Sequence, residues 1–240
     1  MSKIKISKQI MNTRIIFLVV FNVMCSQVFC AAKSEVDNQK NKSSWTIEFE
    51  ENFTKAPNEV EPENLFILDG EFLVKTIEDN KLLELSGSPV GDFGFLFGPR
   101  VKEKAIELQF SFYSSKQGRR FPAIAAGIGG IRGYRFRWNA SSQKILLYRD
   151  DVLLIEKVQG WESSSWWQIR FQILPLQTGK NLIRLKLWQK EKEEPQHWLL
   201  EHRDQFLFKG GKCVLWAFPY SGMPIQFDDL KMLSLKKYCK

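Results

Sequence analysis

Residues 105–113 of the chain read AIELQFSFY, and this stretch alternates apolar and polar side chains almost without a break. One register holds Ile106, Leu108, Phe110 and Phe112, and the other holds Glu107, Gln109, Ser111 and Tyr113. Successive side chains of a β-strand point to opposite faces of its sheet, so the first register would be buried and the second wet. The stretch therefore predicts a half-buried strand of an antiparallel sheet.

The same two-residue period runs through most of the chain after residue 44. Strand-length segments read WTIEFEENF, KLLELSG, KILLYRDDVLLIEKV, SWWQIRFQIL, NLIRLKLWQK, HWLLEHRD, KCVLWAFPY and IQFDDLKMLSL. Short turns rich in Gly and Asp, such as LDGE, YRDD and FKGGK, separate many of these segments, and no window holds a convincing helix of three turns. Many short strands with regular turn signals predict an all-β antiparallel sandwich or barrel.

The stretch GIGGIRGYRFRWN (127–139) places arginines and large aromatic rings in opposite registers. We expect Phe136 to help fill the core and Arg135 and Arg137 to face outward. A bulge at Gly133 could exchange the registers, because glycine accepts irregular strand backbone at little cost. In that alternative the outward residues would be Arg132, Tyr134 and Trp138.

The N-terminal residues have the pattern of an export signal. A basic stretch without acids precedes the apolar run 15–23, and small residues follow at Ala31 and Ala32. This order predicts a cleaved signal peptide, with an uncleaved membrane anchor as the alternative. The predicted organisation is a signal peptide over 1–32, a polar linker over 33–44, the folded domain over 45–236 and a tail over 237–240. The expected location is secreted, periplasmic or extracellular, with no membrane association after cleavage.

Composition argues against nucleic-acid binding. The whole chain carries 35 Lys and Arg against 27 Asp and Glu, a net charge of +8. Cleavage after residue 32 would remove four of the basic residues and none of the acidic ones, which lowers the net charge to +4. The remaining basic residues form short clusters rather than the dense stripe of a nucleic-acid surface, so no nucleic-acid partner is expected.

Two cysteines remain after the predicted cleavage, Cys213 and Cys239. In an oxidising compartment they could form a disulfide, which would stabilise the fold by roughly 3–4 kcal/mol. The alternative is a buried thiol at Cys213 and a free one at the C-terminus. The sequence has no Cys/His spacing typical of zinc, and we expect neither a metal nor a cofactor.

The order of these landmarks resembles the concanavalin A-like lectin and glucanase jelly roll. The resemblance covers residues 45–235 and rests on FEENF, LDGEFLV, IELQFSF, RGYRFRW, WWQIRFQI, GGKCVLWAF and the closing IQFDDLKMLSL. It is nearest to the branch that contains family-16-like and 3-keto-disaccharide hydrolase domains of secreted proteins. The resemblance implies a β-sandwich, an Asp-Gly hairpin at LDGE, and a ligand role for Arg132, which follows a Gly-rich turn as in that branch.

The chain departs from the glucanase pattern at the carboxylates. Family-16 glucanases carry Glu-x-Asp-x-x-Glu on the strand in this part of the fold, and retaining hydrolysis needs two carboxyl groups about 5–5.5 Å apart. Here residues 124–147 contain no Asp or Glu. Asp228 and Asp229 are adjacent, so we expect them to face opposite sides of a strand. A lone strand glutamate such as Glu107 is expected to be solvated.

The polar and aromatic residues that remain form the candidate ligand surface. Sugars suit such a surface, because their C–H faces stack on rings and their hydroxyls bind planar polar groups. The residues assigned to it are Glu107, Gln109, Arg132, Arg135, Arg137, Trp166, Arg170 and Trp188. The expected function is binding of a poly- or oligosaccharide by a secreted domain. The alternatives are a 3-keto-disaccharide hydrolase-like glycoside hydrolase with unassigned catalytic residues, a laminin-G-like structural or protein-binding module, or a merely solvated sheet face.

Overall fold

The computed structural model describes residues 45–176 and 179–235 of the chain. The predicted signal peptide, linker and C-terminal tail lie outside the described residues. Within the described ranges the chain forms fifteen β-strands and contains no helix that could span a membrane. The strands are β1 (Thr46–Glu51), β2 (Phe66–Asp69), β3 (Phe72–Ile77), β4 (Asn80–Leu85), β5 (Phe93–Val101), β6 (Ala105–Ser114), β7 (Ala123–Ile128), β8 (Tyr134–Asn139), β9 (Lys144–Arg149), β10 (Val152–Val158), β11 (Ser165–Pro175), β12 (Asn181–Gln189), β13 (Leu200–Asp204), β14 (Gly211–Phe218) and β15 (Ile225–Leu235).

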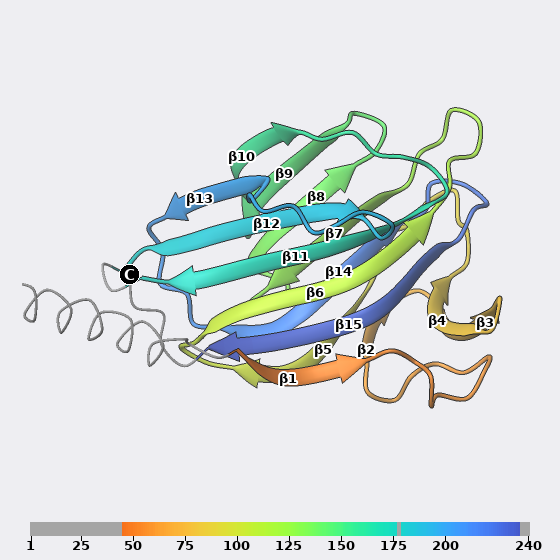
Figure 1. Ribbon diagram of the computed structural model, residues 1–240, viewed down its shortest axis with the longest axis horizontal. Helices are drawn as coiled ribbons and strands as arrows, with labels where there is room; N and C mark the ends of the chain where they lie inside the picture. The colour runs from red at the N-terminus through yellow and green to blue at the C-terminus, as the bar shows by residue number, and fades with distance from the viewer. Residues whose placement is uncertain (1–44, 177–178, 236–240) are drawn as a thin grey trace, which may run out of the picture. The chain divides into compact units, whose positions relative to one another are not determined.

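The strands pair into two antiparallel sheets that lie one over the other (Figure 1). Sheet A follows the order β13-β12-β11-β6-β15-β4-β3, and β1 pairs with β15. Sheet B follows the order β10-β9-β8-β7-β14-β5-β2. Neighbouring strands are often distant in sequence, as β6 and β15 are in sheet A. The predicted fold class, an all-β antiparallel sandwich, is confirmed.

Aromatic side chains from both sheets fill the space between them. Trp138 of β8 meets Trp167 of β11 edge to face, with ring centroids 4.8 Å apart. Phe136 and Phe171 from the same two strands meet at 5.3 Å. Edge-to-face pairs contribute about 0.5–1.5 kcal/mol each beyond the burial of their area. These two pairs hold β8 of sheet B against β11 of sheet A.

Strand β8 has the register that its alternation predicts. Tyr134, Phe136 and Trp138 are buried, and Arg135 and Arg137 are partly exposed on the outer face of sheet B. Pairing with β7 and β9 is continuous, without a bulge at the start of the strand. The alternative register is therefore wrong for Tyr134 and Trp138, because burying their large rings decides the orientation of the strand. The third member of that set, Arg132, is exposed in the turn before β8.

The Asp-Gly hairpin predicted at LDGE is wrong. Strand β2 pairs with β5 in sheet B and β3 pairs with β4 in sheet A. The turn at Asp69 and Gly70 therefore carries the chain from one sheet to the other. The hairpin of this region joins β3 to β4 through Glu78 and Asp79, whose φ angles are +48° and +65°. Positive φ at both central residues is typical of a type I′ hairpin turn, which suits the twist of antiparallel strands.

Cys213 is a free cysteine whose side chain is fully buried in β14, between β5 and β7. Burial raises the pKa of its thiol above the ordinary value, which favours the neutral form. A neutral buried thiol is chemically inert compared with an exposed thiolate. The second cysteine of the predicted pair, Cys239, lies outside the described residues.

A buried polar contact ties the two sheets together at the start of β8. The Tyr134 hydroxyl donates to Asp204 of β13 at 2.8 Å and accepts from the Asn181 amide of β12 at 2.9 Å. Arg149 of β9 adds an ion pair with Asp204 at 2.7 Å. Burial, followed by the hydrogen bond to Asp204, raises the pKa of Tyr134, so its hydroxyl remains protonated and able to donate.

Replacing Tyr134 by Phe should lower the free energy of unfolding by about 1–3 kcal/mol, because the buried Asn181 and the partly buried Asp204 each lose a partner. Tyr148→Phe is the matched control, since Tyr148 is partly exposed and should tolerate the change within about 0.5 kcal/mol. Urea unfolding followed by tryptophan fluorescence measures both variants. Equal effects of the two substitutions would show that the hydroxyl of Tyr134 does not link the sheets.

Candidate functional site

The residues predicted to share one ligand surface lie on two different sheets. Arg135 and Arg137 lie on β8 of sheet B, Arg132 lies in the turn before β8, and the other five lie on β6, β11 and β12 of sheet A. The residues on sheet A are Glu107, Gln109, Trp166, Arg170 and Trp188. Because the sheets pack with their apolar faces together, their outer faces point in opposite directions. The prediction of one surface is therefore wrong, and two separate candidate surfaces replace it.

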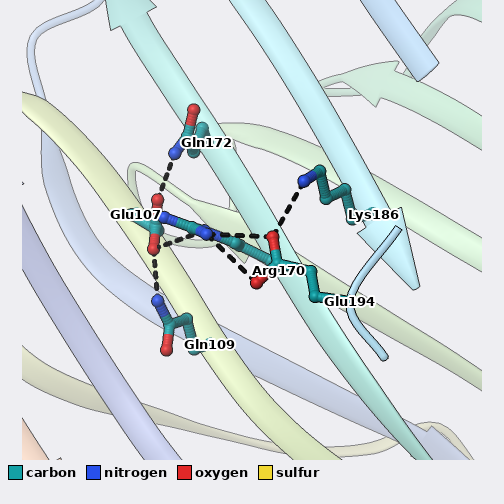
Figure 2. A network of polar contacts seen from close by, with 6 residues as sticks. All are labelled: Glu107, Gln109, Arg170, Gln172, Lys186 and Glu194. Atoms are coloured by element: carbon teal, nitrogen blue, oxygen red, sulfur yellow. Dashed lines mark hydrogen bonds and ion pairs between the residues drawn. The ribbon is translucent and has the colours of Figure 1, made fainter. Parts of the chain in front are cut away.

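On sheet A, Glu107 is fully buried although it was expected to be solvated. The Arg170 guanidinium places its Nε 2.8 Å from Oε1 of the Glu107 carboxylate. The side-chain amides of Gln109 and Gln172 donate to the two oxygens of the same carboxylate (Figure 2). A glutamate on the outer face becomes buried here because long side chains from β6 and β11 lie over it. Its charge is compensated within the sheet.

The segment between β12 and β13 covers the same network. Glu194 accepts from Arg170 at 3.0 Å and from Lys186 at 2.8 Å (Figure 2). Burial opposes ionisation of Glu194, but the Lys186 hydrogen bond and the Arg170 charge together lower its pKa. The Trp198 ring lies 4.9 Å from Lys186 Nζ, within the range of a cation–π contact. Neither Glu194 nor Trp198 was predicted to belong to a site. Glu194 lies in an irregular segment, and Trp198 lies in the strand-like segment HWLLEHRD but two residues before β13 begins.

A cavity of about 350 Å³ lies beside this network on the outer face of sheet A. The residues that line it are Gln109, Phe110, Ser111, Gln168, Ile169, Arg170, Trp188, Glu194, Asp229 and Lys231. Three of the predicted residues therefore come together, whereas Trp166 packs against Tyr113 at 5.6 Å. The charged lining groups have ion-pair partners, which are Glu194 for Arg170, Lys190 for Asp229 and Glu50 for Lys231. The charged groups that line the cavity are thus already neutralised by other residues of the protein.

Asp228 and Asp229 do not face opposite sides of the strand as predicted. Strand β15 has a bulge after Asp228, and Asp229 adopts a φ of +55°. Ser111 is the cross-strand partner of Asp228, yet its hydroxyl donates to Asp229 at 3.1 Å. The extra residue of the bulge therefore brings both carboxylates to the outer side of sheet A. Burial raises the pKa of Asp228, and the nearby charge of Asp229 adds to the effect.

The outer face of sheet B is of a different kind. Its side chains form cross-strand rows over β9, β8, β7, β14 and β5. The rows are Tyr148–Arg135–Gly127–Val214–Leu96, Leu146–Arg137–Ala125–Trp216–Gly94 and Lys144–Asn139–Ala123–Phe218. The small residues of β7 form a low strip between a strand with arginines and a strand with aromatic rings. These rows contain no carboxylate. We call this surface the sheet B face.

Trp216 lies along the sheet B face, between two strand glycines. A Cβ atom added at Gly94 would come within 2.8 Å of the indole Cδ1, and one added at Gly127 within 3.2 Å of Cζ3. Because the ring reaches the backbone of both neighbouring strands, it lies over the sheet and does not stand away from it. A glycine inside a strand often marks such a close approach. The half-buried indole therefore turns one face toward solvent.

The two arginines of β8 are held by aromatic rings. The guanidinium carbon of Arg135 lies 5.2 Å from the Trp216 ring centroid and 5.5 Å from that of Tyr148. Arg137 lies 4.1 Å from the ring centroid of Phe218 and donates to the Tyr220 hydroxyl at 2.7 Å. Cation–π contacts of this kind fix a guanidinium while leaving its edge free to bind another group.

The sequence analysis found the arginines of the sheet B face but missed the rings beside them. Trp216 and Phe218 occupy alternate positions of KCVLWAFPY, so the pattern could have placed them on one face. The pattern does not show that β14 lies beside β7, because that neighbour is distant in sequence. The available signal was that Gly94 and Gly127 each stand between apolar residues, in segments that alternation alone did not predict as strands.

The contribution of the Arg170–Glu107 ion pair can be tested by measuring the free energy of unfolding. Arg170→Met leaves Glu107 buried without its ionic partner and should cost about 3–5 kcal/mol of unfolding free energy. Arg184→Met is the matched control, because its partner Glu201 is exposed and the loss should stay within about 1 kcal/mol. Chemical denaturation at neutral pH compares the two. A small effect of Arg170→Met would mean that the glutamines alone satisfy Glu107.

The raised pKa of Asp228 predicts a pH-dependent effect. Below its ordinary value of 3.8 the carboxyl is neutral in both states, and stability is lost as pH rises through the raised pKa of the folded state. Asp228→Asn keeps an oxygen that can accept from Asn80 and removes the charge. The variant should be more stable than the parent at pH 7, and the difference should vanish below about pH 3.8. Thermal melts across this range measure it, and a difference independent of pH would contradict the assignment.

No protein-family model matches the chain, and no curated protein matches it significantly. Solved structures do match. They include the carbohydrate recognition domain of Emp47p (TM-score 0.56, 8% identity, 81% of this chain and 98% of that one) and a PL-14 alginate lyase from Aplysia kurodai (0.57, 13%, 79% and 99%). A Lotus tetragonolobus seed lectin matches with a TM-score of 0.53 at 10% identity, over 79% and 100% of the two chains. At such low identity these likenesses establish the fold alone: the domain is a jelly-roll sandwich of the kind found in lectin and carbohydrate-recognition domains.

Proposed function

We propose that the chain is a secreted carbohydrate-binding domain whose ligand lies on the sheet B face. The observation that carries this proposal is the position of Trp216, which lies along the sheet between Gly94 and Gly127 with Arg135 beside it. An indole seated in this way is a fixed apolar platform with polar groups at its rim. Binding sites for small polar ligands combine these two elements.

A pyranose ring meets both demands of this surface. Its C–H face can pack on the part of the Trp216 indole that Arg135 leaves uncovered, and its hydroxyls can bind the Arg135 and Arg137 guanidinium groups beside it. Ala123 and Ala125 on the strip between them are buried beside Phe218, with Trp216 and Tyr220 packed against them, so the apolar part of the surface is continuous. The lectin and carbohydrate-recognition domains that share this fold support the proposal.

The outer face of sheet A is less suited to this role. Its Arg170 and Lys186 are bound by Glu194, and Arg170 also binds Glu107. A ligand would have to replace contacts that are already satisfied, and leaving a buried charge without its partner is costly. On the sheet B face no described carboxylate competes with a ligand for the arginines.

We favour binding without cleavage. Hydrolysis of a glycosidic bond uses two carboxyl groups on either side of the bond, and the rows of the sheet B face contain none. The catalytic residues of a hydrolase of the 3-keto-disaccharide type remain unassigned. The proposal of secretion rests on the basic and apolar pattern of residues 1–32.

Trp216→Ala should lower the affinity for a bound glycan at least about tenfold, because the stacking platform is lost. Trp188→Ala, which removes an indole of similar exposure from sheet A, is the matched control and should leave the affinity unchanged. A glycan array identifies the ligand, and calorimetry with the soluble domain gives the affinities. Circular dichroism confirms that both variants are folded.

The reverse pattern, with binding lost in Trp188→Ala and kept in Trp216→Ala, would move the site to sheet A. Release of reducing or keto sugar from the same panel would establish the hydrolase alternative. Absence of any glycan ligand, with capture of an extracellular protein, would favour the laminin-G-like alternative.

A further inference from the structure

We infer that the sheet B face binds an acidic sugar, a glycan whose units carry a carboxylate. The inference rests on the proposed function and adds the chemical class of the ligand. It comes from the state of the two arginines on β8, which differs from that of the charged residues on sheet A.

Aromatic rings hold the Arg135 guanidinium in place, but no hydrogen-bond acceptor in the described residues pairs with it. Its guanidinium lies between the Tyr148 and Trp216 rings, at 5.5 and 5.2 Å. Within the part of the chain that the structure describes, no hydrogen-bond acceptor or carboxylate pairs with it, and no buried polar side-chain atom lacks a partner. Its donors therefore face solvent. A guanidinium is planar and matches the two oxygens of a carboxylate with parallel hydrogen bonds.

Arg137 has neutral partners only. Its Nη2 donates to the Tyr220 hydroxyl at 2.7 Å and its Nε to the Asn139 side chain at 3.0 Å. The Phe218 ring lies under the guanidinium at 4.1 Å. These contacts orient Arg137 and leave its positive charge uncompensated by any described carboxylate.

Sheet A shows the contrast on the same molecule. Arg170, Arg184, Lys186 and Lys190 on its outer face each pair with Glu or Asp. The rows of the sheet B face contain Arg135, Arg137 and Lys144, and only Lys144 has an acidic partner, Glu156 of the adjacent strand β10, at 2.7 Å. The charges of the two arginines are not paired, so the local charge is positive. A positive surface beside apolar rings concentrates anions and favours an anionic ligand over a neutral one of the same shape.

The geometry places the charge where a sugar acid carries it. The carboxylate of a uronic acid is attached to the rim of the ring. Arg135 lies over the Trp216 ring, 5.2 Å from its centroid, so a sugar ring that packs on the uncovered part of the indole has the guanidinium beside it. Arg137 follows two residues along the same strand, roughly 7 Å away, and can reach the next unit of a chain. Two arginines in line suit a run of acidic units.

The experiment compares glycans that differ only in charge. Oligogalacturonate, its methyl ester and the corresponding reduced neutral oligosaccharide are titrated into the folded domain at low and at physiological salt. The free acid should bind at least about tenfold more tightly than the ester, and added salt should reduce the difference. Arg135→Gln should lower affinity for the acid about tenfold and affinity for the ester by clearly less, because Gln can still bind a hydroxyl but cannot pair with a carboxylate. Arg203→Gln, an exposed arginine on sheet A, removes the same charge and should change neither.

The outcomes separate the two proposals. Equal affinity for acid and ester, abolished in Trp216→Ala, would overturn the acidic ligand and keep the carbohydrate-binding function. No binding of any member of the series, acidic or neutral, would overturn both. Tighter binding of a sulfated neutral glycan would replace carboxylate by sulfate, and equal binding of polyglutamate would show that charge alone is recognised.

Discussion

The packing of aromatic rings between the two sheets decides what the rest of the molecule can present. Trp138 and Phe136 of β8 meet Trp167 and Phe171 of β11, and these contacts fix both strands with their large rings inward. Since side chains alternate, every position between the rings must then face outward. Arg135 and Arg137 are displayed because the core requires the residues beside them. The surface chemistry of the domain is thus a consequence of its interior.

The charged side chains on the two outer faces have different kinds of partner. On sheet A, long acidic and basic side chains lie across one another, so that even Glu107 is buried and compensated. The β12–β13 segment adds Glu194 and Trp198 to the same layer. On sheet B, small residues on β7 keep the middle of the face low, and arginines contact rings in place of acids. The paired charges on sheet A suit a structural role, and the unpaired arginines on sheet B suit the binding of a ligand.

Alternation was sufficient to predict the sandwich and the orientation of β8, because burial of rings such as Phe136 decides which face of a strand points toward the core. It did not predict strand β5, because Gly94, Gly98 and Pro99 interrupt the pattern of a segment that pairing with β14 and β2 nevertheless holds in sheet B. It also could not assign strands to sheets. Residues on β6 and β8 look equivalent in sequence, but their partners place them on opposite sides of the domain.

Local irregularities of the strands were the second reason why the sequence did not predict the candidate site in full. The bulge that turns Asp228 and Asp229 to one side depends on pairing with β6, more than a hundred residues away. The burial of Glu107 depends on Arg170 and Gln172 reaching across from β11. Both are contacts between distant segments, and neither leaves a mark in the local pattern.

The seating of Trp216 between Gly94 and Gly127 has a consequence for the thermodynamics of association. A ring resting on backbone, and an arginine clamped between two rings, have lost their rotational freedom when the protein folds. Little further side-chain ordering is then required when a ligand arrives, and the entropic penalty of association is reduced. Such a preorganised surface can reach useful affinity with few contacts and without closing over what it holds.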